Sequence, residues 1–170
     1  MRRGFWFSIK YTEASMSTSG PFLYNGHYYT VVNEAVTWTE AFNTAAAMSY
    51  NGMQGHLVTI TSQGEQDFVR NLTATYVTKG FDYSSVWLGA SDAAEEGVWR
   101  WVAGPEVGTQ FWQGNSAGTP VGGRYVNWQP GVVLNENGAS NMQGSWNNPS
   151  GTGADYAQLN VYQNGGWDDT

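Results

Sequence analysis

Cysteine is absent from this sequence of 170 residues. Its absence excludes disulfide bonds, zinc-thiolate sites and thiol catalysis, so packing, hydrogen bonds or a hard metal ion must hold the domain together. Charge is scarce as well: only 12% of residues are charged, and 14 acidic residues against seven basic ones give a net charge of -7. This balance argues against nucleic acids and anionic membranes as partners and favours cations.

Long hydrophobic runs are also missing near the N-terminus. The apolar stretch from Gly4 to Ile9 is interrupted by Ser8 and stopped by Lys10. It is too short for the hydrophobic region of a signal peptide or for a membrane span. The sequence therefore predicts no insertion into a membrane and leaves secretion undecided.

Aromatic residues are abundant, with nine Trp, ten Tyr and seven Phe, which is enough to build the core of one domain. The stretch from Val86 to Trp101 has two apolar runs around a polar turn, Asp92 to Gly97, and reads as two buried strands. Period-two alternation puts Trp99 and Trp101 on one face. We expect one core, lined by Trp87, Leu88, Trp99 and Trp101 together with Trp38, Phe42 and Leu57.

The remaining elements follow from local patterns. Two capping-box spacings, Thr37 with Glu40 and Ser62 with Glu65, each precede apolar residues at helical intervals. They predict helices at about 38–50 and 63–72. We further expect a tail or linker at 1–20, a domain at 21–170, strands at 27–32, 55–60 and 156–161, and a long irregular loop at about 104–155.

Together these residues resemble a cysteine-free microbial C-type lectin-like domain over about residues 22–170. The resemblance is carried by the order and spacing of G-H-Y-Y at 26–29, G-H-L-V-T-I at 55–60, W-L-G at 87–89, E-E-G-V-W-R-W at 95–101, N-W-Q-P-G at 127–131, D-Y-A-Q-L at 155–159 and G-G-W-D-D at 165–169. It implies an α+β fold, the C-type lectin-like fold, with two helices, small antiparallel sheets and a long loop that binds ligands.

The chain departs from the calcium-dependent members of the family that it resembles. Val132, Val133 and Leu134 stand where the loop tripeptide supplies oxygens, and Ala154 stands where an acidic residue is expected. Asp155, Asp168 and Asp169 remain as candidate metal ligands, unless the last two are an exposed chain end. Calcium is therefore the only cofactor that the resemblance suggests, and we expect it to bind weakly or not at all.

The ligand is expected to contact the long loop and its base. The candidate contact residues are polar or aromatic: Asn135, Glu136, Asn137, Trp146, Asn147, Asn148, Asp155, Trp167 and Asp168. An indole can stack on a sugar ring while amides bond its hydroxyls. We interpret Trp112 and Trp128 as loop anchors and Glu95-Glu96 as a solvated turn. We expect neither His27 nor His56 to be catalytic, and the resemblance implies that His56 is a structural residue.

The resemblance implies a non-catalytic, extracellular or cell-surface module that binds carbohydrate or a cell-surface protein. The alternative is a calcium-independent protein-binding display or receptor-binding scaffold of the phage or bacterial adhesion type. An enzyme of the formylglycine-generating type is disfavoured, because such enzymes use cysteines or bound metals.

The chain also ends before the last strand of the family that it resembles. We therefore expect the strand at 26–32 to lack a partner. We expect one of two outcomes: the alternating segment Phe5 to Tyr11 pairs with the open edge of that strand, or two copies of the chain pair with each other through that edge.

Overall fold

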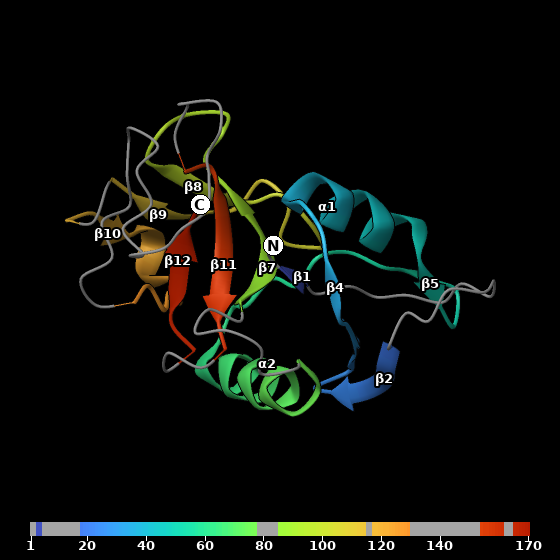
Figure 1. The fold of residues 1–170 in the computed structure, drawn as a ribbon. Coiled ribbons are helices and arrows are strands. Elements are labelled where there is room, and N and C mark those ends of the chain that lie inside the picture. Colours follow the sequence, from blue (N-terminus) through green and yellow to red (C-terminus); the bar gives the residue numbers. More distant parts are fainter. Residues whose placement is uncertain (1–2, 5–17, 78–84, 115–116, 130–153, 162–164) are drawn as a thin grey trace.

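A computed structural model describes residues 3–4, 18–77, 85–114, 117–129, 154–161 and 165–170. Within these ranges the chain forms one six-stranded antiparallel sheet, three two-stranded sheets and two α-helices (Figure 1). Neither described helix is long and apolar enough to cross a membrane. The arrangement is the α+β architecture expected from the sequence.

The six-stranded sheet has the order β10-β9-β8-β7-β11-β12. Its strands are β7 (Ser85–Ser91), β8 (Val98–Trp101), β9 (Gln110–Gln113), β10 (Thr119–Pro120), β11 (Tyr156–Asn160) and β12 (Trp167–Asp169). Every residue of the central strand β7 is buried. The predicted turn between β7 and β8 is confirmed, and it closes on Gly97 with φ of 73°, a conformation that favours glycine.

The predicted start of helix α1 (Trp38–Ala47) is confirmed by a complete capping box. The Thr37 hydroxyl accepts from the Glu40 amide, and the Glu40 carboxylate accepts from the Thr37 amide at 2.8 Å. The predicted end at residue 50 is wrong. Asn51-Gly52, which we interpreted as a helix stop, is instead the turn of a hairpin between β5 (Ser49–Tyr50) and β6 (Met53–Gln54).

Helix α2 (Gln63–Tyr76) begins where predicted but runs beyond the expected end at residue 72. Ser62 caps it, while the Glu65 carboxylate accepts from the amide of Thr61. The sequence did not predict this extra turn, because its apolar pattern is weak. Packing against the rest of the domain stabilises the turn. Thr73 is fully buried, and the Tyr76 ring lies 5.2 Å from that of Phe22.

Strands β2 (Thr18–Tyr24) and β3 (His27–Val32) form a hairpin around the predicted Asn25-Gly26 turn. Strand β2 begins at residue 18, inside the stretch expected to be a tail. A further short pair joins β1 (Arg3–Gly4) to β4 (Glu34–Ala35). The segment Phe5 to Tyr11 lies outside the described residues, so its pairing stays a prediction.

Two sequence-based assignments are corrected by the pairing of the large sheet. Residues 55–60 belong to no strand of the described structure, although Leu57 and Ile60 are fully buried. The loop expected from residue 104 is interrupted by β9, by β10 and by a 3-10 turn at Val121–Gly123. Strand β9 forms because its buried Trp112 pairs with Trp99 of β8.

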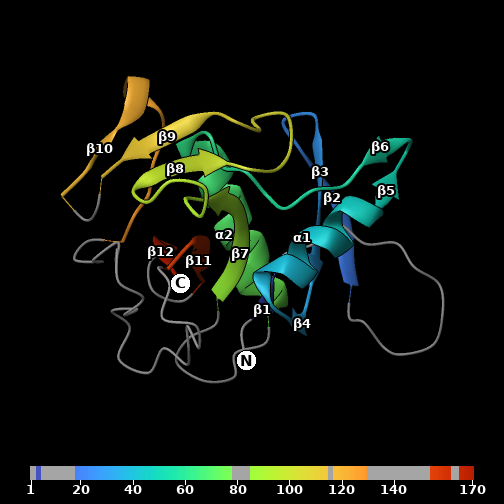
Figure 2. The ribbon, with the colours of Figure 1, turned by 90° about the horizontal axis from the view of Figure 1, so that it is seen from above.

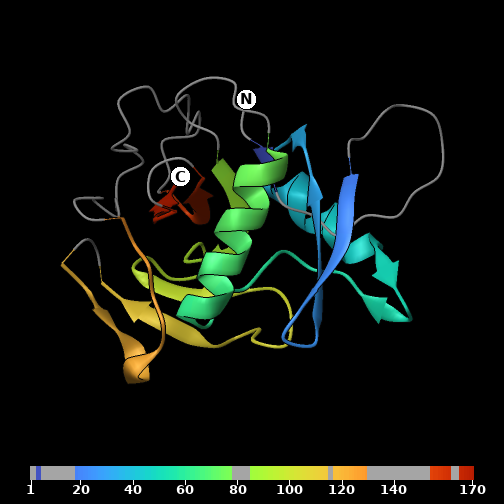
Figure 3. The same cartoon turned by 90° about the horizontal axis from the view of Figure 1, so that it is seen from below.

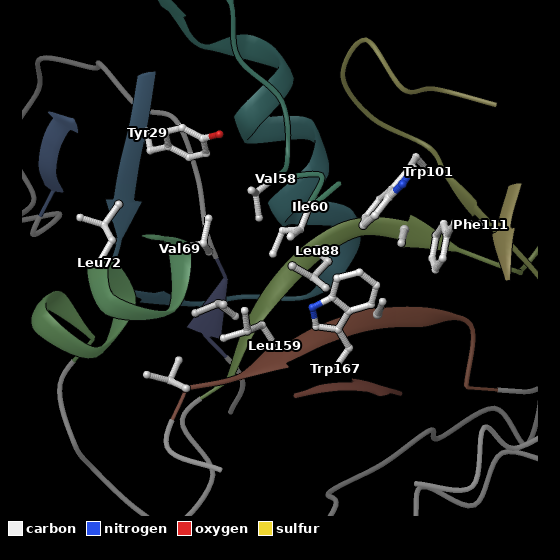
Figure 4. Packing of buried hydrophobic residues seen from close by; sticks show 14 of the residues in the cluster. Tyr29, Val58, Ile60, Val69, Leu72, Leu88, Trp101, Phe111, Leu159 and Trp167 are labelled. Atoms are coloured by element: carbon white, nitrogen blue, oxygen red, sulfur yellow. The ribbon is translucent and has the colours of Figure 1, made fainter. Parts of the chain in front are cut away.

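The expected single core is in fact two clusters, because β7 has buried side chains on both faces. Leu88 joins Trp99 and Trp101 in the first cluster, which α2 covers (Figures 3 and 4). Trp87, the preceding residue of the strand, points to the opposite face and joins Leu57 in the second cluster, with Trp38 and Phe42 packed against it. Alternation along a strand separates neighbours in sequence in this way.

Candidate ligand-binding site

One end of the large sheet gathers acidic residues from three elements. Asp92 follows β7, Asp155 precedes β11, and Asp169 ends β12. The Asp92 amide donates to the Asp155 carbonyl at 3.3 Å, and Thr170 exchanges two backbone hydrogen bonds with Tyr156. The backbone at this end of the sheet is therefore tied together.

Asp92 is the functional candidate that sequence reasoning missed. Its side chain is only 3% exposed, and its Oδ2 accepts from the Gly97 amide at 3.0 Å. Its Oδ1 is buried and has no hydrogen-bond partner in the described structure. Burial, reinforced by Glu96 and Asp155, raises the pKa of Asp92 to about 7. A carboxyl group that titrates near neutral pH in a partly polar site is a recognised mark of a functional region.

Asp155 is half-buried, and burial raises the pKa of its carboxyl group above the ordinary value. Asp155 lies at the base of the segment 130–153, because it follows that segment in the chain and precedes β11. The interpretation of Glu95-Glu96 as an exposed turn is confirmed, since both residues are exposed.

The alternative that Asp168 and Asp169 form an exposed chain end is wrong, because they are 1% and 2% exposed within β12. Asp168 lies opposite Gln158 and Asp169 opposite Ala157, so their side chains point to opposite faces of the sheet. The Gln158 amide approaches the Asp168 carboxylate at 3.5 Å, a long contact.

The predicted metal set of Asp155, Asp168 and Asp169 stays a prediction, because the segment that could complete it lies outside the described residues. Among the described residues, no three His, Asp or Glu side chains are placed so that they could hold a metal ion. The physical reason is the alternation along β12, which separates two of the three carboxylates. The buried oxygen of Asp92 does not complete such a group with the other carboxylates that the structure describes.

Trp167 was a predicted contact residue, but its side chain is fully buried. Its indole N–H donates to the Gln66 Oε1 at 2.8 Å, and the Gln66 Nε2 donates to the Gly165 carbonyl at 2.7 Å. Gln66 thereby joins α2 to the turn before β12. This corrects the expectation for Trp167, whose indole is a core side chain because the rings of the first cluster enclose it (Figure 4).

Replacing Gln66 by Met should destabilise the domain by about 2 kcal/mol, because the buried indole N–H of Trp167 then loses its acceptor. The Gly165 carbonyl keeps a second donor, the Asn127 amide at 3.0 Å. Urea unfolding followed by far-UV circular dichroism measures the change. Gln63→Met, at an exposed position of the same helix, is the matched control. Equal stability of the two variants would contradict the role of Gln66.

The interpretation of Trp112 and Trp128 as anchors is confirmed. The Trp112 side chain is 8% exposed, and the Trp128 ring lies 5.0 Å from that of Trp99 and 5.8 Å from that of Trp167. Beyond Trp128, the Gln129 amide donates to the Trp167 carbonyl at 2.8 Å. The chain is therefore fixed in place just before residue 130.

The other predicted contact residues lie outside the described residues. They are Asn135, Glu136, Asn137, Trp146, Asn147 and Asn148. His56 has the structural role expected of it, since its Nδ1 lies 2.8 Å from the Leu57 carbonyl oxygen and its ring packs against Gly104.

Comparison with known proteins places this sequence in a family. The C-type lectin domain model matches residues 34–170. Halomucin of Haloquadratum walsbyi is 39% identical over 129 residues, which cover 72% of this chain and 1% of that protein. Snaclec 3 of Sistrurus catenatus edwardsii is 34% identical over 96 residues, which cover 55% of this chain and 60% of that protein.

Among solved structures, the C-type lectin CEL-I of Cucumaria echinata is similar, with 23% identity and a TM-score of 0.48, covering 79% of this chain and 74% of that one. Because the family model spans most of the sequence, including both helices and the large sheet, the chain belongs to the C-type lectin domain family, a non-catalytic binding fold.

Proposed function

We propose that this domain recognises a carbohydrate or another cell-surface ligand through the segment 130–153 and the residues at its base. The base is formed by Asp155 and by the polar face of β12 at Asp168. The proposed contact residues in the segment are Asn135, Glu136, Asn137, Trp146, Asn147 and Asn148.

The observation that carries the proposal is the anchoring of both ends of this segment on neighbouring strands. Gln129 binds the backbone of β12, and its side chain accepts from the Asn160 amide of β11 at 3.0 Å. At the other end Ala154 is buried, and Asp155 is tied to Asp92. Binding residues are often carried by segments that a rigid framework holds in this way.

The proposed chemistry uses this chain's own side chains. The indole of Trp146 would stack on the apolar face of a sugar ring, and the asparagine amides would donate to and accept from its hydroxyl groups. At the base, the half-buried carboxylate of Asp155 would accept further hydroxyl hydrogen bonds. Recognition of neutral, hydroxyl-rich ligands is compatible with the net charge of -7, because such ligands are not repelled.

Trp146→Ala is expected to weaken ligand binding about tenfold or more without changing the melting temperature. The substitution removes a stacking contact that contributes ~1.4 kcal/mol of binding free energy. A glycan array identifies the ligand, and titration calorimetry measures the loss. Trp128→Ala is the matched control and should lower the melting temperature, since Trp128 packs on the first cluster.

Hydrogen exchange measured with and without ligand locates the binding site on the chain. Protection should fall within residues 130–153, and protection confined to α1 and α2 would reject the proposal. Full binding by Trp146→Ala would remove that residue from the site.

A second candidate is recognition of a protein without calcium. The observation that favours it is the separation of Asp168 from Asp169 on opposite faces of β12. An array without hits, combined with cell binding that survives EDTA and is lost after protease treatment of the cells, would select this candidate. In both cases we place the domain outside the cell or at its surface, which its relation to Halomucin and to lectins supports.

A further inference from the structure

Three aromatic side chains pack against one another where helix α1 meets strand β11. The Trp38 ring lies 4.4 Å from the Tyr156 ring and 5.0 Å from the Phe42 ring, and it is close to parallel with both. All three side chains are partly exposed and pack against the second cluster. Tyr156 is the first residue of β11 and directly follows Asp155. The stack therefore begins beside the base of the segment 130–153.

The stack holds the Tyr156 ring in one orientation. The Trp38 indole N–H donates to the Leu88 carbonyl at 2.8 Å, which fixes the plane against which Tyr156 packs. The Tyr156 backbone is fixed as well, because it exchanges hydrogen bonds of 3.2 and 3.0 Å with Thr170. A side chain that is ordered before a ligand arrives loses little conformational entropy on binding. Tyr156 is therefore a preorganised contact surface.

Tyr156 also has binding capacity that the described part of the chain does not use. Trp38 is the only described residue whose ring contacts the Tyr156 ring. The Tyr156 hydroxyl likewise has no hydrogen-bond partner among the described residues. Buried tyrosine hydroxyls usually have such a partner, so a partly exposed hydroxyl without one is available to a ligand.

The Asp155 carboxylate adds a negative charge near this ring. Asp155 is half-buried, and its charge acts on the Tyr156 hydroxyl. Burial first, and then the charge of Asp155, raise the pKa of the Tyr156 hydroxyl above its ordinary value. The hydroxyl therefore keeps its proton at neutral pH and can donate as well as accept. Ring, hydroxyl and carboxylate together offer an apolar plane with a polar edge.

We propose that Tyr156 is a stacking residue of the binding site and that, together with Asp155, it selects neutral hexopyranoses over uronic acids. This inference rests on the carbohydrate recognition proposed above and names a sugar class for it. The C–H face of a pyranose ring packs on Tyr156, while the Tyr156 hydroxyl and the Asp155 carboxylate bond its hydroxyl groups. A uronic acid brings a second carboxylate close to Asp155, and like charges in a partly desolvated site repel one another.

The first test measures stacking by NMR titration of the chain with the methyl glycosides of galactose, glucose and mannose. Tyr156→Leu should raise the dissociation constant about tenfold or more, and Tyr156→Phe about threefold, because Phe keeps the ring and loses only the hydroxyl. Tyr50→Leu is the matched control and should leave the dissociation constant unchanged. Tyr50 is a partly exposed tyrosine whose ring also contacts another ring, and its strand β5 lies away from β11 (Figures 1 and 2).

The second test measures selection by charge with the methyl glycosides of glucuronic and galacturonic acid. These probes differ from the neutral glucoside and galactoside only by a carboxylate in place of the primary alcohol. The parent chain should bind them about tenfold more weakly or worse, and Asp155→Asn should recover most of that difference. Asp67→Asn removes the same charge from an exposed position of α2, so it should recover none.

The outcomes separate this inference from the function on which it rests. Unchanged sugar affinity in a folded Tyr156→Leu variant would overturn the role of Tyr156 and leave carbohydrate recognition standing. If Tyr156→Leu does not fold, unchanged affinity in Tyr156→Phe would overturn that role instead. Equal affinity of the parent for a glucoside and its glucuronide would overturn the selection by Asp155. A parent chain that binds none of the methyl glycosides would overturn the inference and the proposed carbohydrate function together.

Discussion

Trp99→Ala is expected to destabilise the domain by about 3 to 5 kcal/mol, which is a large part of the stability of a typical small domain. The Trp99 side chain is 1% exposed and belongs to the first cluster. It pairs across the sheet with Trp112 and meets the Trp128 ring edge to face at 5.0 Å. Truncation removes the transfer free energy of an indole and leaves a cavity among rings that cannot easily close it.

Urea unfolding followed by far-UV circular dichroism measures the loss, with thermal melting as a second readout. Trp99→Phe should cost less than Trp99→Ala, because it keeps an aromatic ring in the cluster. Leu23→Ala, at a side chain that is 61% exposed, is the control and should lie within about 0.5 kcal/mol of the parent chain. Unchanged melting of Trp99→Ala would refute the central place of β8 in this core.

Local signals in the sequence predicted local structure well. The capping residues Thr37 and Ser62 fix the helix starts, because the hydrogen bonds involved span only three residues. The Asn25-Gly26 and Asp92 to Gly97 turns were found for the same reason. The end of α1 was missed, because Asn51-Gly52 suits both a helix stop and a hairpin turn, and only the pairing of β5 with β6 decides between them.

Long-range packing explains the other differences. Trp87 and Leu88 both read as core residues, but their assignment to separate clusters depends on which elements cover each face of β7. Trp167 looks like a contact residue until Gln66 of α2 is seen to accept its indole N–H. Asp92 was read as part of a polar turn, since its burial requires the approach of Asp155 from a distant part of the chain.

The buried carboxyl group of Asp92 has a consequence for stability that changes with pH. Its pKa is about 7 in the folded domain, against about 3.9 for an unfolded chain. Between these values the folded state binds more protons than the unfolded state, so the free energy of unfolding falls as the pH rises. The destabilisation caused by ionising the buried Asp92 is absent below about pH 4 and fully present above about pH 7.

Asp92→Asn should therefore stabilise the domain by roughly 4 kcal/mol near pH 8 and by almost nothing near pH 4. The amide oxygen of Asn can still accept from the Gly97 amide, so the hydrogen bond at 3.0 Å is retained. Urea unfolding at both pH values, in EDTA to remove divalent cations, measures the difference. Asp67→Asn is the control, because it makes the same substitution at an exposed position of α2. A gap between Asp92→Asn and the parent that is the same at both pH values would show that Asp92 does not titrate near neutrality.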